Sequence, residues 1–437
     1  MIEDYLAIFE AYVVKSPEYG AATFHLLMGQ LPAIRNIQIM RTPKSFLDSR
    51  VHVVYFSPTG SGKGEGFNLF ARLAAACGVT FYPTGSLTTK ALIGSVSPRQ
   101  KGEEKERIKY GALHPERGYN IVASSEGKNI LKEKPGEREQ DIMTHLQQTM
   151  NTMGTADATV STETGIGDPI TFQPNCSLLI TSHPIVNLSS IVLETGFLQR
   201  TYFVARTLSN IERQEIERVQ VEREKQMKNN PESLDTTEAE TWLVKRLQYV
   251  NSQYLGATQM IVDPGAVEYL NRYNANLYEM IGNSDPFLRE QLGGFITRFR
   301  GLRLKLAANR ARLSLHETIQ IPDASYADYH TKFVFANLIS YLERTIDIPM
   351  SILRRHNQFK NRTLTAYKRL IGSNPLYSSG STNGWVLETD LIAAIKTMWS
   401  VTGITAVKYI EYLTSAGVLS RETYAKIGNK VVVKLKE

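Results

Sequence analysis

The distribution of apolar residues predicts alternating strands and helices over the first half of the chain. Residues 51–56 form an apolar run rich in β-branched and aromatic side chains, and similar runs cover 121–123 and 176–180. Such runs are typical of strands buried inside a parallel sheet. Residues 68–78 instead carry leucine, phenylalanine and alanine at helical spacing, which predicts a helix that ends at Gly78. We therefore expect an α/β fold with a parallel sheet flanked by helices.

The end of the chain has a different pattern. After a Gly/Ser-rich segment at 372–384, residues 388–398 and 405–417 have helical spacing, and two β segments then flank Gly428. Helix, turn, helix and hairpin resemble a winged-helix domain, whose last helix and wing often contact DNA. The phosphate contacts would then be Lys408, Arg421, Lys426 and Lys430. The alternative is a module used for protein contacts.

Composition limits the class of protein. The 437 residues are 42% hydrophobic and 21% charged, as in ordinary globular proteins of two or three domains. A formal net charge of +7 permits a polyanionic partner such as nucleic acid. Cys77 and Cys176 lie among apolar residues, which favours buried thiols in a reducing compartment over a zinc site. No segment has the pattern of a secretory signal or the length of a membrane span, so we expect a cytoplasmic protein.

The candidate phosphate-binding residues connect the first predicted strand to its helix. Their sequence, SPTGSGKGE, matches the GxxxxGK[ST] loop at its second glycine and its lysine. Glycines there allow successive backbone N–H groups to point at a β-phosphate, and the helix N-terminus adds its positive dipole. The alternative is a glycine-rich turn with an incidental lysine. The predicted nucleotide-binding residues are Ser57, Pro58, Thr59, Gly60, Ser61, Gly62, Lys63, Gly64 and Glu65.

The rest of a nucleotide site is expected at the ends of the two other apolar runs. Ser125 and Glu126 follow the second run, where many ATPases have Asp-Glu to hold the magnesium water shell and activate the attacking water. His183 follows the third run, where a polar side chain suits sensing of a γ-phosphate. Taken alone, each is more often an ordinary strand end. Their order after the loop favours a site.

Six segments in the same order carry a resemblance to a known family. Residues 51–208 resemble the AAA+ ATPase module of the minichromosome maintenance (MCM) helicases and of related phage, plasmid and viral helicases. The segments are SPTGSGKG, YPTGSLTTKALIGSVSP, GALHPERGYNIVASSEGKN, HLQQTMNTM, NCSLLITSHP and LETGFLQRTYFVAR. The resemblance implies an AAA+ P-loop ATPase core (51–210), followed by a charged helical linker and lid (211–371). The residue pattern predicts an N-terminal helical segment (1–50) packed on that core, a linker (372–384) and a winged helix (385–437).

The resemblance also implies roles for individual residues. Lys63 would contact the β- and γ-phosphates, Glu126 would be the catalytic base, and His183 would stand at the sensor position. These three side chains would form the part of the site that belongs to one subunit.

Arginines would complete the site from outside. By the same resemblance, Arg200 would be a finger that reaches the ATP of a neighbouring subunit. Arg298, in the segment ITRFRGLRLKLAANRARL, would be a second sensor on a lid helix, with Arg300 as runner-up and a merely solvated basic face as the alternative. A finger supplied by a neighbour requires a homo-oligomer, and family members form hexamers around nucleic acid.

DNA contact is expected at two further places. The pore hairpin of the family corresponds to residues 158–174, where polar and apolar residues alternate around a glycine-rich tip that lacks the usual lysine. The insert at 97–111 resembles in position another channel-facing segment and carries Lys101 and Lys105. The alternative for this mixed-charge insert is a solvated loop.

Two departures from the pattern affect the metal. Gly64 removes the hydroxyl that normally ligates Mg²⁺, and Ser125 replaces the aspartate. Either Ser124, Ser125, Glu65 or Glu126 holds the metal's water shell instead, or the protein hydrolyses ATP slowly or not at all. Retention of the lysine, the glutamate and the finger arginine favours compensation, with Ser125 and Glu126 as the expected metal residues.

Three hypotheses about function follow. The leading one is an ATP- and Mg²⁺-dependent hexameric DNA helicase or translocase acting in DNA replication. The second is an ATP-regulated origin-binding or helicase-loading protein whose specificity lies in the winged helix. The third is a catalytically degenerate ring subunit that acts through interaction alone.

Overall fold

The computed structural model of the chain divides into two compact units. The first comprises residues 1–283 and 290–345, and the second comprises 284–289 and 346–437. The structure describes residues 1–13, 16–42, 44–84, 88–97, 107–124, 127, 137–162, 169–185, 196–206, 208–229, 235–282, 286–345, 353–378, 384–399, 403–415, 418–424 and 430–435.

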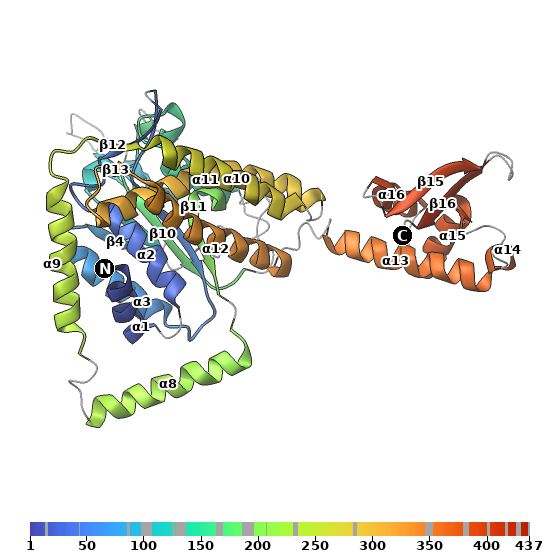
Figure 1. Cartoon of the computed structure of the whole chain (residues 1–437), viewed down its shortest axis with the longest axis horizontal. Coiled ribbons are helices and arrows are strands. Elements are labelled where there is room, and N and C mark those ends of the chain that lie inside the picture. Colours follow the sequence, from blue (N-terminus) through green and yellow to red (C-terminus); the bar gives the residue numbers. More distant parts are fainter. Residues whose placement is uncertain are drawn as a thin grey trace. The chain divides into compact units, whose positions relative to one another are not determined.

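A five-stranded parallel sheet forms the centre of the first unit (Figure 1). Its strand order is β11-β3-β10-β7-β4, and every neighbouring pair is parallel. The bounds are β3 (His52–Phe56), β4 (Phe81–Thr84), β7 (Ile121–Ser124), β10 (Ser177–Ser182) and β11 (Thr201–Ala205). β3, β7 and β10 are buried along their whole length, as their apolar sequences require. The α/β class and the parallel sheet flanked by helices are therefore confirmed.

Helices from the N-terminal segment pack on this sheet. α1 (Ile2–Tyr12) lies against α3 (Lys63–Ala76), and α2 (Pro17–Gln30) lies against β3 and β11. The ring of Tyr19 stacks on that of Tyr55 in β3, with 3.9 Å between centroids. Packing of residues 1–50 on the core agrees with the sequence.

The same segment is not only helical, because residues 38–47 form strands. β1 (Gln38–Thr42) and β2 (Ser45–Leu47) belong to a second sheet of order β13-β12-β1-β2, with β12 (Gln259–Val262) and β13 (Thr318–Ile319). β1 pairs in parallel with β12. The N-terminal segment is thereby joined by backbone hydrogen bonds to the region predicted as a lid.

Two antiparallel pairs are inserted into the core. β5 (Gly94–Ser97) pairs with β6 (Arg107–Tyr110), and β8 (Val160–Thr162) pairs with β9 (Ile170–Phe172). The second pair confirms the predicted hairpin. Its tip at 163–168 lies outside the described residues.

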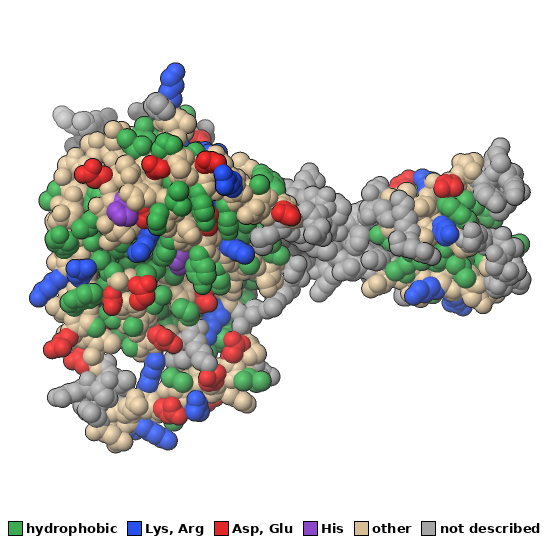
Figure 2. All heavy atoms as spheres, viewed as in Figure 1, with side chains coloured by type: hydrophobic (Ala, Val, Ile, Leu, Met, Phe, Trp, Pro, Cys, Tyr) green, Lys and Arg blue, Asp and Glu red, His purple; other side chains and the backbone are tan. Residues whose placement is uncertain are grey.

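The remaining elements of the first unit are mainly helical. They are α4 (Thr89–Leu92), α6 (Glu137–Met150), α8 (Asn210–Asn229), α9 (Thr237–Gln253), α10 (Pro264–Gly282), α11 (Pro286–Leu313) and α12 (Ile321–Thr345), with short 3₁₀ turns at Pro115–Arg117, Ala156–Ala158 and Leu198–Arg200. α8 carries Lys, Arg and Glu side chains interspersed along its length (Figure 2). It is a solvated charged helix, as its sequence predicts.

The second unit is built from helices and one small sheet. Its elements are α13 (Leu353–Ser373), α14 (Pro375–Ser378), β14 (Val386–Leu387), α15 (Glu388–Trp399), α16 (Gly403–Ser415), β15 (Leu419–Tyr424) and β16 (Lys430–Leu435). The two predicted helices and two predicted strands are present, while the residues between the helices, 400–402, lie outside the described residues. The compact unit nevertheless begins before residue 385, because Ala366 and Tyr367 of α13 share a core with Ile395 and Ile410. α13 therefore belongs to this unit rather than to the lid.

Candidate nucleotide site and arginine cavity

The loop at 57–62 leaves the carboxyl end of β3 and leads directly into α3. Gly60 and Gly62 both have φ of +78°, a left-handed conformation that glycine adopts without steric cost. Ser57, which replaces the first glycine of the motif, is not among the described residues with positive φ, so a serine is accommodated there. The first N–H groups of α3 have no acceptor within their own helix and point toward the loop. This is the geometry of an anion-binding helix N-terminus.

Lys63 is oriented across this loop. Its Nζ donates to the carbonyl oxygen of Ser57 (2.8 Å), the residue directly after β3. It also donates to the carbonyl oxygen of Ser182 (3.1 Å), the last residue of β10. Partial burial lowers the pKa of Lys63. The amine is thus held between the ends of two strands. In this partly desolvated position its charge-assisted hydrogen bond to a phosphate oxygen would be strong.

Three buried hydroxyl groups around Lys63 have no hydrogen-bond partner among the described residues. They are those of Ser57, Ser61 and Ser182. Buried hydroxyls are normally paired, so three together at one loop indicate a polar ligand. The donor set of N–H groups, hydroxyls and an amine fits the phosphates of a nucleotide.

The neighbouring strand ends place the other predicted residues beside the loop. β10 lies between β3 and β7 in the sheet, and His183 follows β10. Of the two neighbouring strands, β3 precedes the Lys63 loop and β7 precedes Glu126. The His183 ring is exposed, and its Nδ1 lies 3.5 Å from Oγ1 of Thr59 in the loop. Ser125 and Glu126 themselves lie outside the described residues. The structure brings His183 and Lys63 to one edge of the sheet, as predicted.

Gly64 is the position where a metal-binding hydroxyl is absent. A Cβ added there would meet no atom within 4 Å, so the space beside the first turn of α3 is open. Within the described part of the chain, no group of three His, Cys, Asp or Glu side chains is placed to hold a metal ion. The expected metal residues, Ser125 and Glu126, lie outside the residues that this finding covers.

We expect Gly64→Thr to fold normally and to strengthen metal-dependent nucleotide binding, because the added hydroxyl enters open space at a ligating position. A single added oxygen ligand should lower the Mg²⁺ concentration for half-maximal binding by about threefold to tenfold. Titration of Mg²⁺ at fixed nucleotide, with Gly64→Val as the control of nearly equal size, measures this. An equal effect of both substitutions would contradict a ligating role.

Arg200 and Arg298 lie together, away from the loop. Arg200 Nη1 donates to the Gly196 carbonyl (2.8 Å), and Arg298 Nη1 donates to Oε1 of Gln199 (2.7 Å). Gly196 has φ of +78°, and a Cβ there would collide with the Arg298 guanidinium and lie 2.8 Å from Nη1 of Arg200. Burial, and then the adjacent charge of Arg298, lower the pKa of Arg200 to about 10. Two cations held this close favour an anion beside them.

The arginine pair lies at the amino ends of the sheet strands, whereas the nucleotide loop lies at their carboxyl ends. Thr201 of β11 pairs with His52 of β3, whereas the loop begins beyond Phe56, which pairs with Ala205. Four strand steps separate the two ends by about 13 Å. The pair therefore faces away from the nucleotide loop of its own chain.

A cavity of about 310 Å³ opens beside the arginine pair. Its described lining includes Arg41 of β1, Arg200, Arg298 and Lys305 as cations, with Asp157 as the carboxylate. We call it the arginine cavity. The sequence predicted two of its cations, but Arg41 and Asp157 carry no motif and were missed.

The basic residues of α11 are divided between the core and the surface. Arg303, Lys305 and Arg312 are buried rather than part of a solvated face. Arg303 is paired with Asp328, and Arg312 donates to the Ser49 hydroxyl. Arg298 is exposed and Arg300 is partly exposed, so the alternative of a solvated basic face stays open for these two residues.

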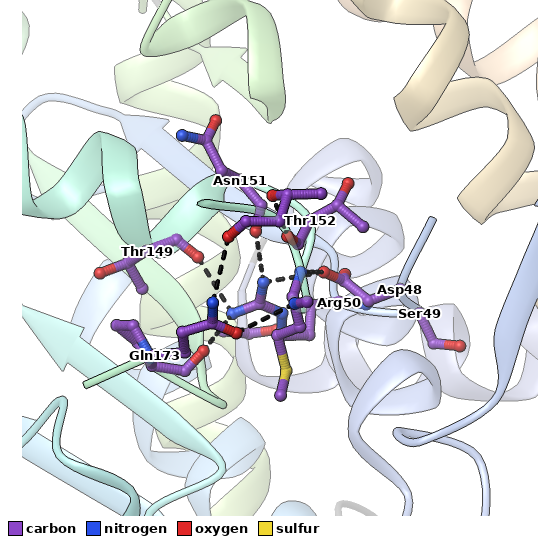
Figure 3. A network of polar contacts seen from close by, with 12 residues as sticks. Asp48, Ser49, Arg50, Thr149, Asn151, Thr152 and Gln173 are labelled. Carbon is purple, nitrogen blue, oxygen red and sulfur yellow. Dashed lines mark hydrogen bonds and ion pairs between the residues drawn. The ribbon is translucent and has the colours of Figure 1, made fainter. Parts of the chain in front are cut away.

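Lys305 belongs to a buried network that no motif indicated. Figure 3 shows the part of this network around Arg50 and Asp48. Its centre is Arg50, whose guanidinium donates to Asp48 and to the carbonyls of Thr149, Asn151, Pro174 and Cys176. Asp48 also accepts from Lys305 Nζ (3.2 Å) and from the Met153 N–H (2.9 Å). Burial alone would raise the pKa of Asp48, but the charges of Arg50 and Lys305 hold it well below its ordinary value. We call Asp48, Arg50 and Lys305 the buried triad.

The residues predicted to contact DNA are only partly described. Lys101, Lys105 and Lys426 lie outside the described residues, as does the side chain of Lys408. Arg421 makes a bidentate ion pair with Glu388, and Lys430 is exposed at the start of β16. The ion pair engages the guanidinium of Arg421 in a contact within the unit.

No protein-family model matches the sequence, and no curated protein matches it significantly. Both cysteines are free and buried, in agreement with the sequence. Among the described helices, none has the length and apolar character needed to cross a membrane.

Proposed function

We propose that the chain is an ATPase of the MCM-like AAA+ type, which assembles into a ring and translocates on DNA. The observation that carries the proposal is the separation of the two half-sites. A nucleotide loop with Lys63 occupies one edge of the central sheet, and the Arg200–Arg298 pair occupies the opposite edge. Head-to-tail contact between copies would bring the pair of one copy to the loop of the next. Repeated contacts of this kind form a ring when the rotation between copies closes, as we propose here, and an open filament when it does not.

The loop residues support nucleotide binding within one subunit. Lys63, the N-terminus of α3 and the three buried hydroxyls supply donors for the β- and γ-phosphates. Mg²⁺, when bound, would neutralise developing charge on the phosphates. Glu126 is proposed as the base that takes a proton from the attacking water, and His183 as the group that orients that water.

The arginine pair supports catalysis between subunits. Negative charge spreads over the transferred phosphoryl group in the transition state, and fixed guanidinium groups stabilise it. The burial of Arg200 and its contact with the Gly196 carbonyl fix the group before the reaction, so little reorganisation is needed. The β8–β9 hairpin and the C-terminal unit are the proposed DNA-contacting parts, and the winged-helix assignment of that unit belongs to this proposal.

Steady-state ATP hydrolysis with Mg²⁺, measured with and without single-stranded DNA, tests the function. We expect turnover that DNA stimulates. Binding of nucleotide without turnover would leave a nucleotide-gated scaffold instead, and sequence-specific duplex binding without strand displacement would favour an origin-binding or loading role.

Lys63→Ala should weaken nucleotide binding by about 10- to 100-fold, because one charge-assisted hydrogen bond to phosphate is lost. Equilibrium titration with a fluorescent ATP analogue measures the loss. Lys90→Ala, an exposed lysine in α4, is the matched control and should bind normally. Equal affinity of the Lys63→Ala variant and the natural protein would show that the loop does not bind phosphate.

A further inference from the structure

Gln199 connects the two arginines of the pair. It precedes Arg200 in the 3₁₀ turn, and its Oε1 accepts the hydrogen bond from Arg298 Nη1. The backbone of this turn is fixed, because Leu198 is fully buried and its carbonyl accepts from the Thr201 hydroxyl of β11 (2.9 Å). Only 4% of Gln199 is exposed, whereas Arg298 is exposed on α11. A buried, fixed amide therefore contacts a long side chain at the surface.

The amide of Gln199 lies along one turn of α11. A Cβ on Gly294 would lie 3.9 Å from its Nε2, and its Oε1 meets Arg298, four residues later on the same helix. Residues four apart share one face of a helix, so the nitrogen of the amide is directed to one end of this turn and the oxygen to the other. The oxygen is the end that a guanidinium requires, because a guanidinium can only donate.

The arginine pair needs such a contact because its two charges repel each other. Both guanidinium groups come together over Gly196: Arg200 donates to its carbonyl, and a Cβ there would collide with the guanidinium of Arg298. After burial, the charge of Arg298 is the next cause that lowers the pKa of Arg200. An exposed arginine beside a like charge moves toward water unless an acceptor holds it, because water favours both its charge and its rotamer freedom.

The acceptor is neutral, so it holds Arg298 without cancelling the charge. A carboxylate at the same place would form an ion pair with the guanidinium and would repel an approaching anion. The oxygen of Gln199 carries only a partial charge, so both guanidinium groups keep their attraction for a phosphate.

We propose that Gln199 is a positioning residue, which holds Arg298 beside Arg200 so that both guanidinium groups act on one phosphate-type anion. The inference rests on the proposed function for the identity of that anion, the terminal phosphates of a neighbour's nucleotide. The contact that positions Arg298 lies within one chain. In this role Gln199 acts on the anion only through Arg298.

Binding of pyrophosphate to the full chain tests the inference without ATP hydrolysis. The chain should carry Lys63→Ala, which weakens phosphate binding at the nucleotide loop, and isothermal titration calorimetry then measures the remaining site. We expect saturable binding that Arg200→Ala abolishes. Gln199→Met keeps the length of the side chain but removes the acceptor, and should weaken this binding by about threefold to tenfold because Arg298 must then be ordered as the anion binds. Gln248→Met, at an exposed glutamine of α9 that also makes a side-chain hydrogen bond, is the matched control and should leave the affinity unchanged.

A double-mutant cycle separates positioning from a general structural role. In a chain that carries Arg298→Ala as well as Lys63→Ala, Gln199→Met should weaken pyrophosphate binding by less than about twofold, because no guanidinium is left to hold. Gln199→Glu keeps the shape of the side chain, but its carboxylate neutralises one cation. It should therefore weaken binding by about tenfold or more while Arg298 is present.

Three outcomes would overturn the inference. They are an equal loss from Gln199→Met with and without Arg298, an undiminished affinity of the Gln199→Met variant, and the absence of any pyrophosphate binding that requires Arg200. ATP turnover of the natural protein is a separate measurement, so the ATPase proposal succeeds or fails independently of this result.

Discussion

Arg200→Ala is expected to lower ATP turnover by about a thousandfold, while nucleotide binding to the same chain remains intact. The first effect follows from the loss of a guanidinium that stabilises the transferred phosphoryl group. The second follows from the position of Arg200 at the sheet edge opposite to its own nucleotide loop. Turnover and equilibrium nucleotide affinity, measured side by side on one preparation, separate the two effects.

Mixing of two inactive variants makes the test decisive. In a random ring of Lys63→Ala and Arg200→Ala subunits, about one interface in four pairs an intact lysine with an intact arginine. The mixture should therefore recover up to about a quarter of the natural turnover, although neither variant is active alone. A mixture that stays inactive while still assembling would contradict action between subunits. Arg298→Ala and Arg300→Ala, tested in the same way, decide which of these two arginines assists.

Arg50→Met is expected to destabilise the first unit by about 3–5 kcal/mol. The substitution keeps the volume of the buried stem but leaves the Asp48 carboxylate with less compensation and leaves several carbonyls without a donor. Chemical denaturation with a probe for the first unit measures the loss. Arg272→Met, in an exposed ion pair on α10, is the control and should change stability by less than about 0.5 kcal/mol.

The contribution of the buried triad to the free energy of unfolding depends on pH. The pKa of Asp48 is lowered in the folded chain, so its ionised form stabilises the fold above its ordinary pKa, near 3.8, and that contribution is lost as the pH falls below it. The difference in unfolding free energy between the natural protein and Asp48→Asn should therefore be largest at neutral pH and shrink in acid. A difference that stays constant between pH 5 and pH 2 would argue against an ionised Asp48.

The sequence predicted those parts of the molecule whose signals are local. The run at 51–56 followed by glycines and Lys63 is sufficient to define β3, its loop and α3, because strand and helix periods change there. The alternation around 158–174 likewise defines the β8–β9 hairpin. The arginines at 200 and 298 were found through the resemblance, and the structure places them side by side.

The missed features depend on partners far apart in the chain. Lys305 and Arg303 are cationic, and such residues are usually exposed, so nothing in the pattern of α11 indicates that Asp48 and Asp328 neutralise them inside the core. β1 was missed because its polar residues weaken the strand pattern, and its pairing with β12 supplies the missing stabilisation. α13 reads as part of the lid because only its packing on α15 and α16 assigns it to the second unit.

The order of the central strands has a consequence for synthesis of the protein. β3 pairs only with β10 and β11 within this sheet, and both follow it along the chain. On the ribosome, β3 is therefore complete long before either neighbour emerges, and its backbone edges remain open until residues 177–205 have left the exit tunnel. Open edges of an apolar strand invite pairing with other chains. A nascent chain that stalls between β7 and β10 should consequently depend on chaperones, and its truncated product should aggregate.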